Sequence, residues 1–126
     1  MSAKNNILII TNNSEIAQVL KPKLVLLREV DNINTIKYPE ALATIKLELP
    51  DAVLLYCSDD KKDALELIKE IKNDKLTQNV EILIVLDRYE QEFVLSAYDE
   101  GIADYFVFNN DDAEVLMRTI WCLKKN

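Results

Sequence analysis

The apolar residues of this chain change their spacing repeatedly along the sequence. Continuous apolar runs such as "NILII", "AVLLY" and "VEILIVL" indicate buried strands, whereas the apolar residues of "PEALATIKLEL" and "KDALELIKEIKND" repeat with the period of a helix. Strands that are apolar throughout and are joined by helices form parallel sheets covered on both faces, with right-handed connections. The alternation therefore predicts an α/β fold, a doubly wound parallel sheet in a three-layer sandwich.

Five strands and five helices fit this pattern. The expected strands are 6–10, 29–36, 52–56, 80–86 and 104–108, of which 29–36 is the weakest, and the expected helices are 14–27, 39–49, 62–74, 91–101 and 111–125. Ser14 is expected to cap the first helix, Pro39 to lie in the first turn of the second, and Gly101 to end the fourth. Pro22 removes one hydrogen bond inside the first helix, so we expect a kink or an early end there.

The length and composition are those of one globular domain. Of the 126 residues, 49% are hydrophobic and 29% are charged, which is enough apolar material for a core. We expect residues 1–126 to form a single domain, and the abrupt end "WCLKKN" is compatible with the N-terminal part of a longer protein. The apolar runs are far shorter than the roughly 20 residues that span a bilayer, and no secretion signal is visible. We therefore expect a cytoplasmic protein without a membrane partner.

The charge, the cysteines and the glycine argue against several classes of site. The formal net charge of -7 repels phosphate backbones, so no nucleic acid is expected as a partner of this domain. The chain has no histidine, and Cys57 and Cys122 lack metal-ligand spacing, so both are expected to be free, buried thiols. Gly101 is the only glycine, which rules out the glycine-rich loops that bind nucleotide phosphates. We expect no cofactor and no metal.

Three segments, in this order, resemble the receiver domains of two-component response regulators. They are "ILIITNNSEI", "PDAVLLYCSDDKKDALELIKEIKND" and "GIADYFVFNN", and the resemblance covers essentially the whole chain. It implies a flavodoxin-like sheet of five strands, with the functional residues at the carboxyl ends of the strands. It also implies transfer of a phosphoryl group from a histidine of a partner kinase to an aspartate. In that reaction carboxylates hold Mg2+, while a lysine and a hydroxyl group bind the phosphoryl oxygens.

This chain departs from the receiver pattern at every reactive position. The acidic pair corresponds to Thr11 and Asn12, the acceptor aspartate to Tyr56, the hydroxyl residue to Leu86, the lysine to Phe108 and the following proline to Asn109. Neutral ligands in place of carboxylates hold Mg2+ poorly. We expect Tyr56, Leu86 and Phe108 together to fill the pocket, so that the chain is neither a phosphoacceptor nor an enzyme.

Two other interpretations remain open. In the first, the chain is a phosphoaccepting receiver that uses an unconventional carboxylate, Asp59 or Asp60, with Asp87 nearby on an acidic rim. An acceptor also needs a cationic clamp, and we expect no lysine opposite these carboxylates. In the second, "TNNSE" binds a phosphate of flavin or of another small ligand on the same architecture, although the segment has no glycine.

The last predicted helix carries an aromatic residue away from its core face. Leu116, Ile120 and Leu123 repeat at helical spacing and are expected to face the core. This leaves Trp121 to one side of the helix, together with Met117. Trp121 therefore either flanks the core or forms part of a contact surface, and both interpretations stay open.

Two tyrosines are expected to border the same face as Trp121. They are Tyr98 in the helix 91–101 and Tyr105 in the strand 104–108, and Arg118 is placed to reach an acidic group of a partner. We therefore predict a pseudo-receiver, a domain of two-component signalling that works without phosphorylation as a protein interaction or dimerisation module. Its partner is expected to be another protein, a second copy of the chain or a covalently linked output domain. The expected interface comprises the two elements just named and the last helix.

Overall fold

The computed structural model describes residues 5–28, 30–108 and 112–124, and one parallel sheet forms the centre of the fold. The strands lie in the order β2-β1-β3-β4-β5, and each neighbouring pair is parallel. The strands are β1 (Asn5–Ile10), β2 (Val30–Ile36), β3 (Ala52–Cys57), β4 (Glu81–Leu86) and β5 (Asp104–Val107). The helices are α1 (Ser14–Leu24), α2 (Tyr38–Glu48), α3 (Lys61–Lys72), α4 (Gln91–Glu100) and α5 (Asp112–Lys124). This arrangement confirms the predicted doubly wound α/β sandwich.

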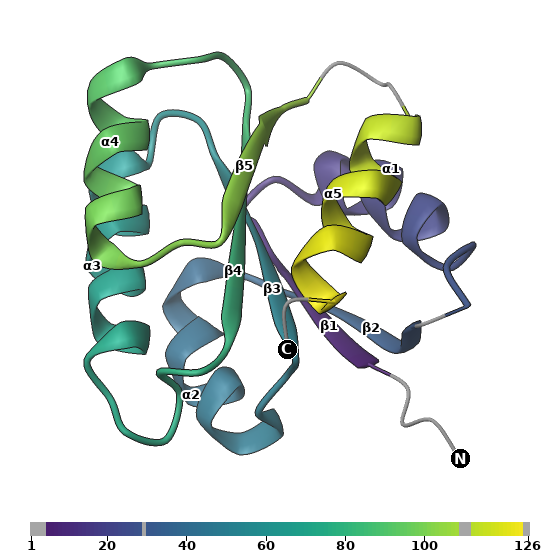
Figure 1. Cartoon of the computed structure of the whole chain (residues 1–126), viewed down its shortest axis with the longest axis horizontal. Helices are drawn as coiled ribbons and strands as arrows, with labels where there is room; N and C mark the ends of the chain where they lie inside the picture. The colour runs from purple at the N-terminus through teal and green to yellow at the C-terminus, as the bar shows by residue number, and fades with distance from the viewer. Residues whose placement is uncertain (1–4, 29, 109–111, 125–126) are drawn as a thin grey trace.

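Helices cover both faces of the sheet (Figure 1). The helices α2, α3 and α4 pack on one face, and α1 and α5 pack on the other. The strand β3 explains why both faces must be covered, because all six of its side chains are buried. Its residues alternate between the two faces, so that Val53 and Leu55 contribute to the core under α2–α4, whereas Leu54 contributes to the core under α1 and α5.

Local signals in the sequence set several of the element boundaries. Pro39 lies in the first turn of α2, as predicted. Gly101 ends α4 with a φ of 107°, a left-handed conformation that glycine adopts without a steric penalty, also as predicted. The weak strand expected at 29–36 is present as β2.

The helix α1 begins at Ser14 and ends early, soon after Pro22, as predicted, but its capping residue differs from the prediction. Ser14 is the first helical residue, and the cap is Asn13, whose side chain accepts a hydrogen bond from the backbone N–H of Glu15 at 3.0 Å. Both residue types cap helices well, and the extended backbone of Asn13 decides between them. The helix includes Pro22 and ends at Leu24, before the end of the predicted segment.

The carboxyl ends of the strands lie at one edge of the sheet, the upper edge in Figure 1, because all neighbouring strands are parallel. The loops that follow β1, β3 and β4 and the residue that follows β5 meet there, so this edge positions the candidate site. In the part of the chain that the structure describes, no helix combines the length and the apolar character needed to span a membrane.

Candidate functional site

Tyr56 lies near the carboxyl end of β3 and is buried. Only 8% of its surface is exposed, and the strand register places it opposite Val85 of β4. Its ring belongs to the core under α1 and α5, and Phe108 packs against the same core from the end of β5. Leu86 instead pairs with Cys57 and belongs to the core on the other face. The three side chains that were expected to fill one pocket are therefore divided between two faces, because neighbouring residues of a strand point to opposite sides.

The phenol of Tyr56 is close to several carboxylates. Burial raises the pKa of Tyr56, and the negative charges of Asp87 and Asp60 raise it further. Asp59, which is exposed, adds a smaller contribution in the same direction to this pKa. The acidic rim expected from the sequence is thus present, and together with burial it raises the pKa of a phenol that is protonated at neutral pH in any case.

The side chains of Thr11 and Asn12, in the loop that follows β1, accept hydrogen bonds from backbone N–H groups. Thr11 is only 2% exposed, and its Oγ1 accepts a hydrogen bond from the backbone N–H of Asn13 at 2.9 Å. The Oδ1 atom of Asn12 accepts a hydrogen bond from the backbone N–H of Tyr38 at 3.1 Å, at the first residue of α2. Both side chains therefore satisfy backbone donors at the start of helices or in the turn before them.

Tyr38 reaches the same strand end from α2. Its hydroxyl group donates a hydrogen bond to the backbone oxygen of Tyr56 at 2.7 Å and lies 3.6 Å from the Sγ atom of Cys57. Burial raises the pKa of Tyr38 and raises the pKa of Cys57 to about 12, so both groups stay protonated at neutral pH. Neither Cys57 nor Cys122 forms a disulfide bond, and both side chains are buried, as predicted. The sequence shows Tyr38 only as an aromatic residue before Pro39, which does not reveal its contact with β3.

A lysine lies at this edge, contrary to the expectation from the sequence. Lys61, the first residue of α3, donates a hydrogen bond to the backbone oxygen of Ser58, and its Nζ atom lies 3.7 Å from Asp87 Oδ1 and 3.5 Å from Glu90 Oε2. Its side chain is only 18% exposed. Lys61 therefore connects the loop after β3 to the loop before α4 through a hydrogen bond and two ion pairs. The sequence could not show this, because the acidic partners come from a different loop and are distant along the chain.

The oxygen atoms at this edge do not fit a magnesium site. Mg2+ prefers near-octahedral coordination anchored by carboxylates. The matching positions offer a protonated phenol, a threonine hydroxyl and an asparagine amide, and the last two already accept hydrogen bonds from the backbone. Asp60 Oδ1 accepts a hydrogen bond from the backbone N–H of Ser58 at 3.1 Å. Within residues 5–28, 30–108 and 112–124, no group of three or more acidic or cysteine side chains is arranged to hold a metal ion.

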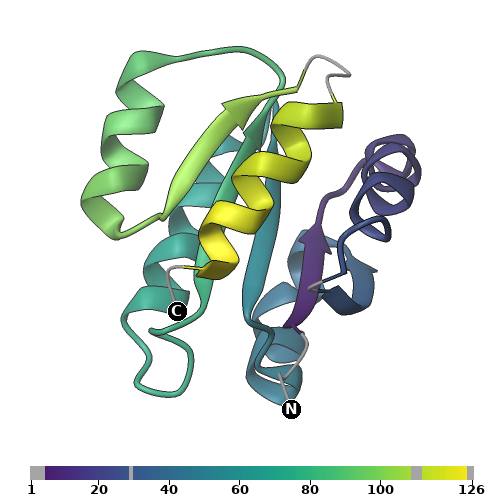
Figure 2. The same ribbon diagram turned by 45° about the vertical axis from the view of Figure 1, so that its right-hand side comes forward.

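A second group of side chains lies on α4, β5 and α5, which run side by side (Figure 2). The hydroxyl of Tyr98 donates a hydrogen bond to Asp104 Oδ1 at 3.3 Å, and the rings of Tyr98 and Tyr105 meet edge to face with centroids 6.2 Å apart. Tyr89 adds a third ring, 6.0 Å from that of Tyr105. The Nη1 atom of Arg118 lies 2.8 Å from Asp104 Oδ2. Arg118 is therefore paired within the chain, and because its side chain is 45% exposed, its contact with an acidic group of a partner stays a prediction.

Trp121 and Met117 lie one turn apart on α5 and are largely exposed, by 63% and 69%. Leu123 of the same helix is buried, as expected for its core face. The exposure of Trp121 excludes the interpretation that it flanks the core. The side chains of Leu116 and Ile120, and Asn109 as a whole, lie outside the described residues.

Comparisons with known proteins give one relative by sequence and many by fold. No protein-family model matches the sequence. The chain is 29% identical over 126 residues to the transcriptional regulatory protein KdpE of Staphylococcus aureus, and the match covers 98% of this chain and 52% of that protein. The chain thus spans about half the length of the curated relative that it matches.

The fold is similar to those of solved response regulators. The phosphorylated cyanobacterial phytochrome response regulator RcpA superposes with a TM-score of 0.82 at 19% identity, over 98% of this chain and 97% of that chain. A DNA-binding response regulator of the LuxR family from Staphylococcus aureus superposes with a TM-score of 0.81 at 17% identity, over 94% of this chain and 98% of that chain. The chain therefore has the fold of these solved response regulators.

Proposed function

We propose that this chain is a receiver-like domain of two-component signal transduction that works without phosphorylation, a pseudo-receiver. The observation that carries the proposal is Tyr56, a buried and protonated phenol at the strand end that corresponds to the acceptor aspartate. A phenol with a raised pKa is a poor nucleophile and a poor ligand for Mg2+. The similarity to a transcriptional regulatory protein supports a place in signalling.

Incubation with acetyl phosphate and Mg2+ tests this proposal. The mass of the intact protein is measured before and after incubation, with a receiver that has the usual acidic residues and lysine as a parallel control. The control should gain a phosphoryl group, and this chain should not. A phosphoryl group on Asp59 or Asp60 would instead support the phosphoaccepting interpretation, and a flavin absorption spectrum of the purified protein would support the ligand-binding one.

We further propose that the face formed by α4, β5 and α5 binds a protein partner, a second copy of the chain or a covalently linked output domain. Three large side chains support this use, because Trp121, Met117 and Tyr98 (41% exposed) are accessible on neighbouring elements. Partly exposed aromatic residues are typical anchors of protein interfaces. Without a phosphoryl group to control it, association through this face depends on the concentration of the partner.

Replacement of Trp121 by alanine tests the interface. The change should weaken self-association or output-domain binding, measured by sedimentation, by about 2 kcal/mol or more, as for a hot-spot residue. The melting temperature should stay unchanged because the side chain is 63% exposed. Leu47→Ala is the matched control, since Leu47 is 85% exposed on α2. A lowered melting temperature with unchanged association, or an equal loss in the Leu47 variant, would contradict the proposed face.

A further inference from the structure

Basic and acidic side chains of α3 lie on different sides of the helix. On the side toward α4, Lys61 lies 3.5 Å from Glu90, and Lys69 Nζ lies 3.8 Å from Glu100 Oε2. Lys62 lines the space between α3 and α4 as well. Three of the four lysines of this helix are thus directed toward α4, and two of these three are paired there. The fourth, Lys72, donates hydrogen bonds to the backbone oxygens of Gln78 and Val80.

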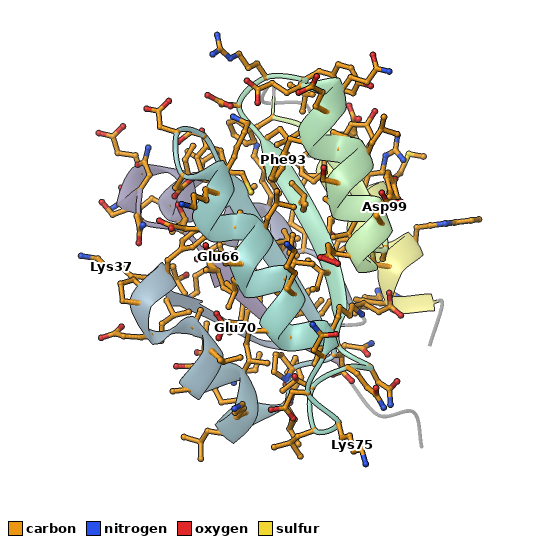
Figure 3. The ribbon with its side chains drawn as sticks, turned by 90° about the vertical axis from the view of Figure 1, so that its left-hand side faces the viewer. Lys37, Glu66, Glu70, Lys75, Phe93 and Asp99 are labelled. Carbon is orange, nitrogen blue, oxygen red and sulfur yellow. The ribbon has the colours of Figure 1, made fainter. Side chains whose placement is uncertain are left out.

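The opposite side of α3, toward α2, carries three carboxylates (Figure 3). Asp63, Glu66 and Glu70 follow the spacing i, i+3 and i+7, which places them in one row along the helix, and all three are exposed. Among the residues that the structure describes, none of the three forms an ion pair. Other helical carboxylates do, as Glu100 shows with Lys69. Within the described part of the chain, this row therefore carries negative charge without an ion-pair partner.

A groove of about 380 Å³ runs beside this row, between α2 and α3. Its floor contains Leu67, which is buried, and Tyr38 and Leu42, which are half-buried and pack against the core. The groove thus combines an apolar floor with a rim of unpaired carboxylates. A partner that places an apolar side chain on this floor and positive charges against the rim is complementary to the groove in both respects.

We propose that this groove binds an amphipathic helix of a partner protein, with an apolar side chain on its floor and lysine or arginine residues against Asp63, Glu66 and Glu70. The acidic row extends about 10 Å along α3, from a rise of roughly 1.5 Å per residue. A partner helix lying along α3 presents basic residues at the same spacing, next to apolar residues at i, i+3 or i+4, and i+7. The proposal does not depend on the face of α4, β5 and α5, which lies elsewhere on the molecule.

Binding of a synthetic peptide tests the proposal. The probe is a helical peptide of roughly 15 residues with a leucine stripe flanked by lysines, and its two control peptides carry glutamates for the lysines or alanines for the leucines. Titration into the full chain, followed by nitrogen–proton correlation spectra, should shift the resonances of Tyr38, Leu42 and Leu67. Each control peptide should bind at least about tenfold more weakly.

Two charge-reversal variants complete the test. Glu66→Lys with Glu70→Lys should weaken binding of the basic peptide at least about tenfold. Glu92→Lys with Asp99→Lys, which reverses two exposed carboxylates on α4, should change it less than about twofold. Melting curves check that both variants are folded. Equal losses in the two variants, resonance shifts confined to α4, β5 and α5, or no binding of the basic peptide would each overturn the proposal.

Discussion

At the scale of single residues, Tyr56 shows how the surroundings of a strand end determine which side chain fits there. The ring is buried in the core under α1 and α5, and the phenol lies near Asp87 and Asp60. A carboxylate here would be repelled by both of those charges, and an aspartate side chain would leave part of the space of the ring unfilled. The surroundings of Tyr56 therefore favour a neutral aromatic group over an aspartate side chain.

Tyr56→Asp should lower the free energy of unfolding by about 2–4 kcal/mol, because a charge replaces a buried ring. The variant should also remain unphosphorylated by acetyl phosphate, since Thr11, Asn12 and Phe108 stay in the positions of the metal ligands and the lysine. Tyr56→Phe is the matched control and should cost less than about 1 kcal/mol, because the ring remains. Denaturant unfolding measures both, and an unchanged stability of Tyr56→Asp would show that the ring contributes no packing energy.

The thiol of Cys57 predicts how stability depends on pH. Its pKa rises from an ordinary 9.0 to about 12 in the fold, because burial favours the uncharged form. A group whose pKa is raised in the fold stabilises it fully below the unfolded pKa, and this contribution is lost as the pH rises toward the folded pKa. The free energy of unfolding should therefore fall more steeply above about pH 9 in the wild type than in Cys57→Ala. Parallel pH profiles of the two proteins would contradict the burial of the thiol.

At the scale of elements, Lys61 connects two loops whose contact is not apparent from the sequence. It joins the loop after β3 to Asp87 and Glu90, the residues that precede α4. Strand and helix positions follow from local apolar spacing, whereas this connection depends on how two loops fold over the edge of the sheet. For the same reason the sequence predicted the acidic rim but not the lysine within it.

Lys61→Met should lower the free energy of unfolding by about 1 kcal/mol, because Asp87 and Glu90 lose their shared cation. The loss should shrink at about 1 M salt, since the carboxylates are partly exposed and their charges are screened. Lys62→Met is the control, because Lys62 is exposed and the structure gives it no ion pair. Equal losses in the two variants, measured by denaturant unfolding at low and high salt, would show that the Lys61 contacts contribute no stability.

At the scale of the whole molecule, the sequence was sufficient for the architecture and insufficient for the geometry of the site. Buried runs such as 80–86 and the helical spacing of 62–74 predicted the layers, because these patterns follow directly from which faces are covered. The division of Tyr56 and Leu86 between two faces depends on the exact register of β3 and β4, which apolar spacing alone does not fix. Similarly, the exposure of Trp121 depended on how α5 is rotated against β5, and the sequence left it open.

Titration with Mg2+ and beryllofluoride, an analogue of the phosphoryl group, tests directly whether this domain works without phosphorylation. A ligand stabilises a fold by RT ln(1 + [L]/Kd), so weak binding leaves no measurable effect. We expect no saturable change in the nitrogen–proton resonances of Tyr56, Asp59 and Asp60, and no rise in melting temperature at millimolar Mg2+. A saturable change at these residues, or a rise of several degrees in melting temperature, would show that this edge of the sheet binds the metal and the phosphoryl analogue. Such a result would contradict the proposal that the domain works without phosphorylation.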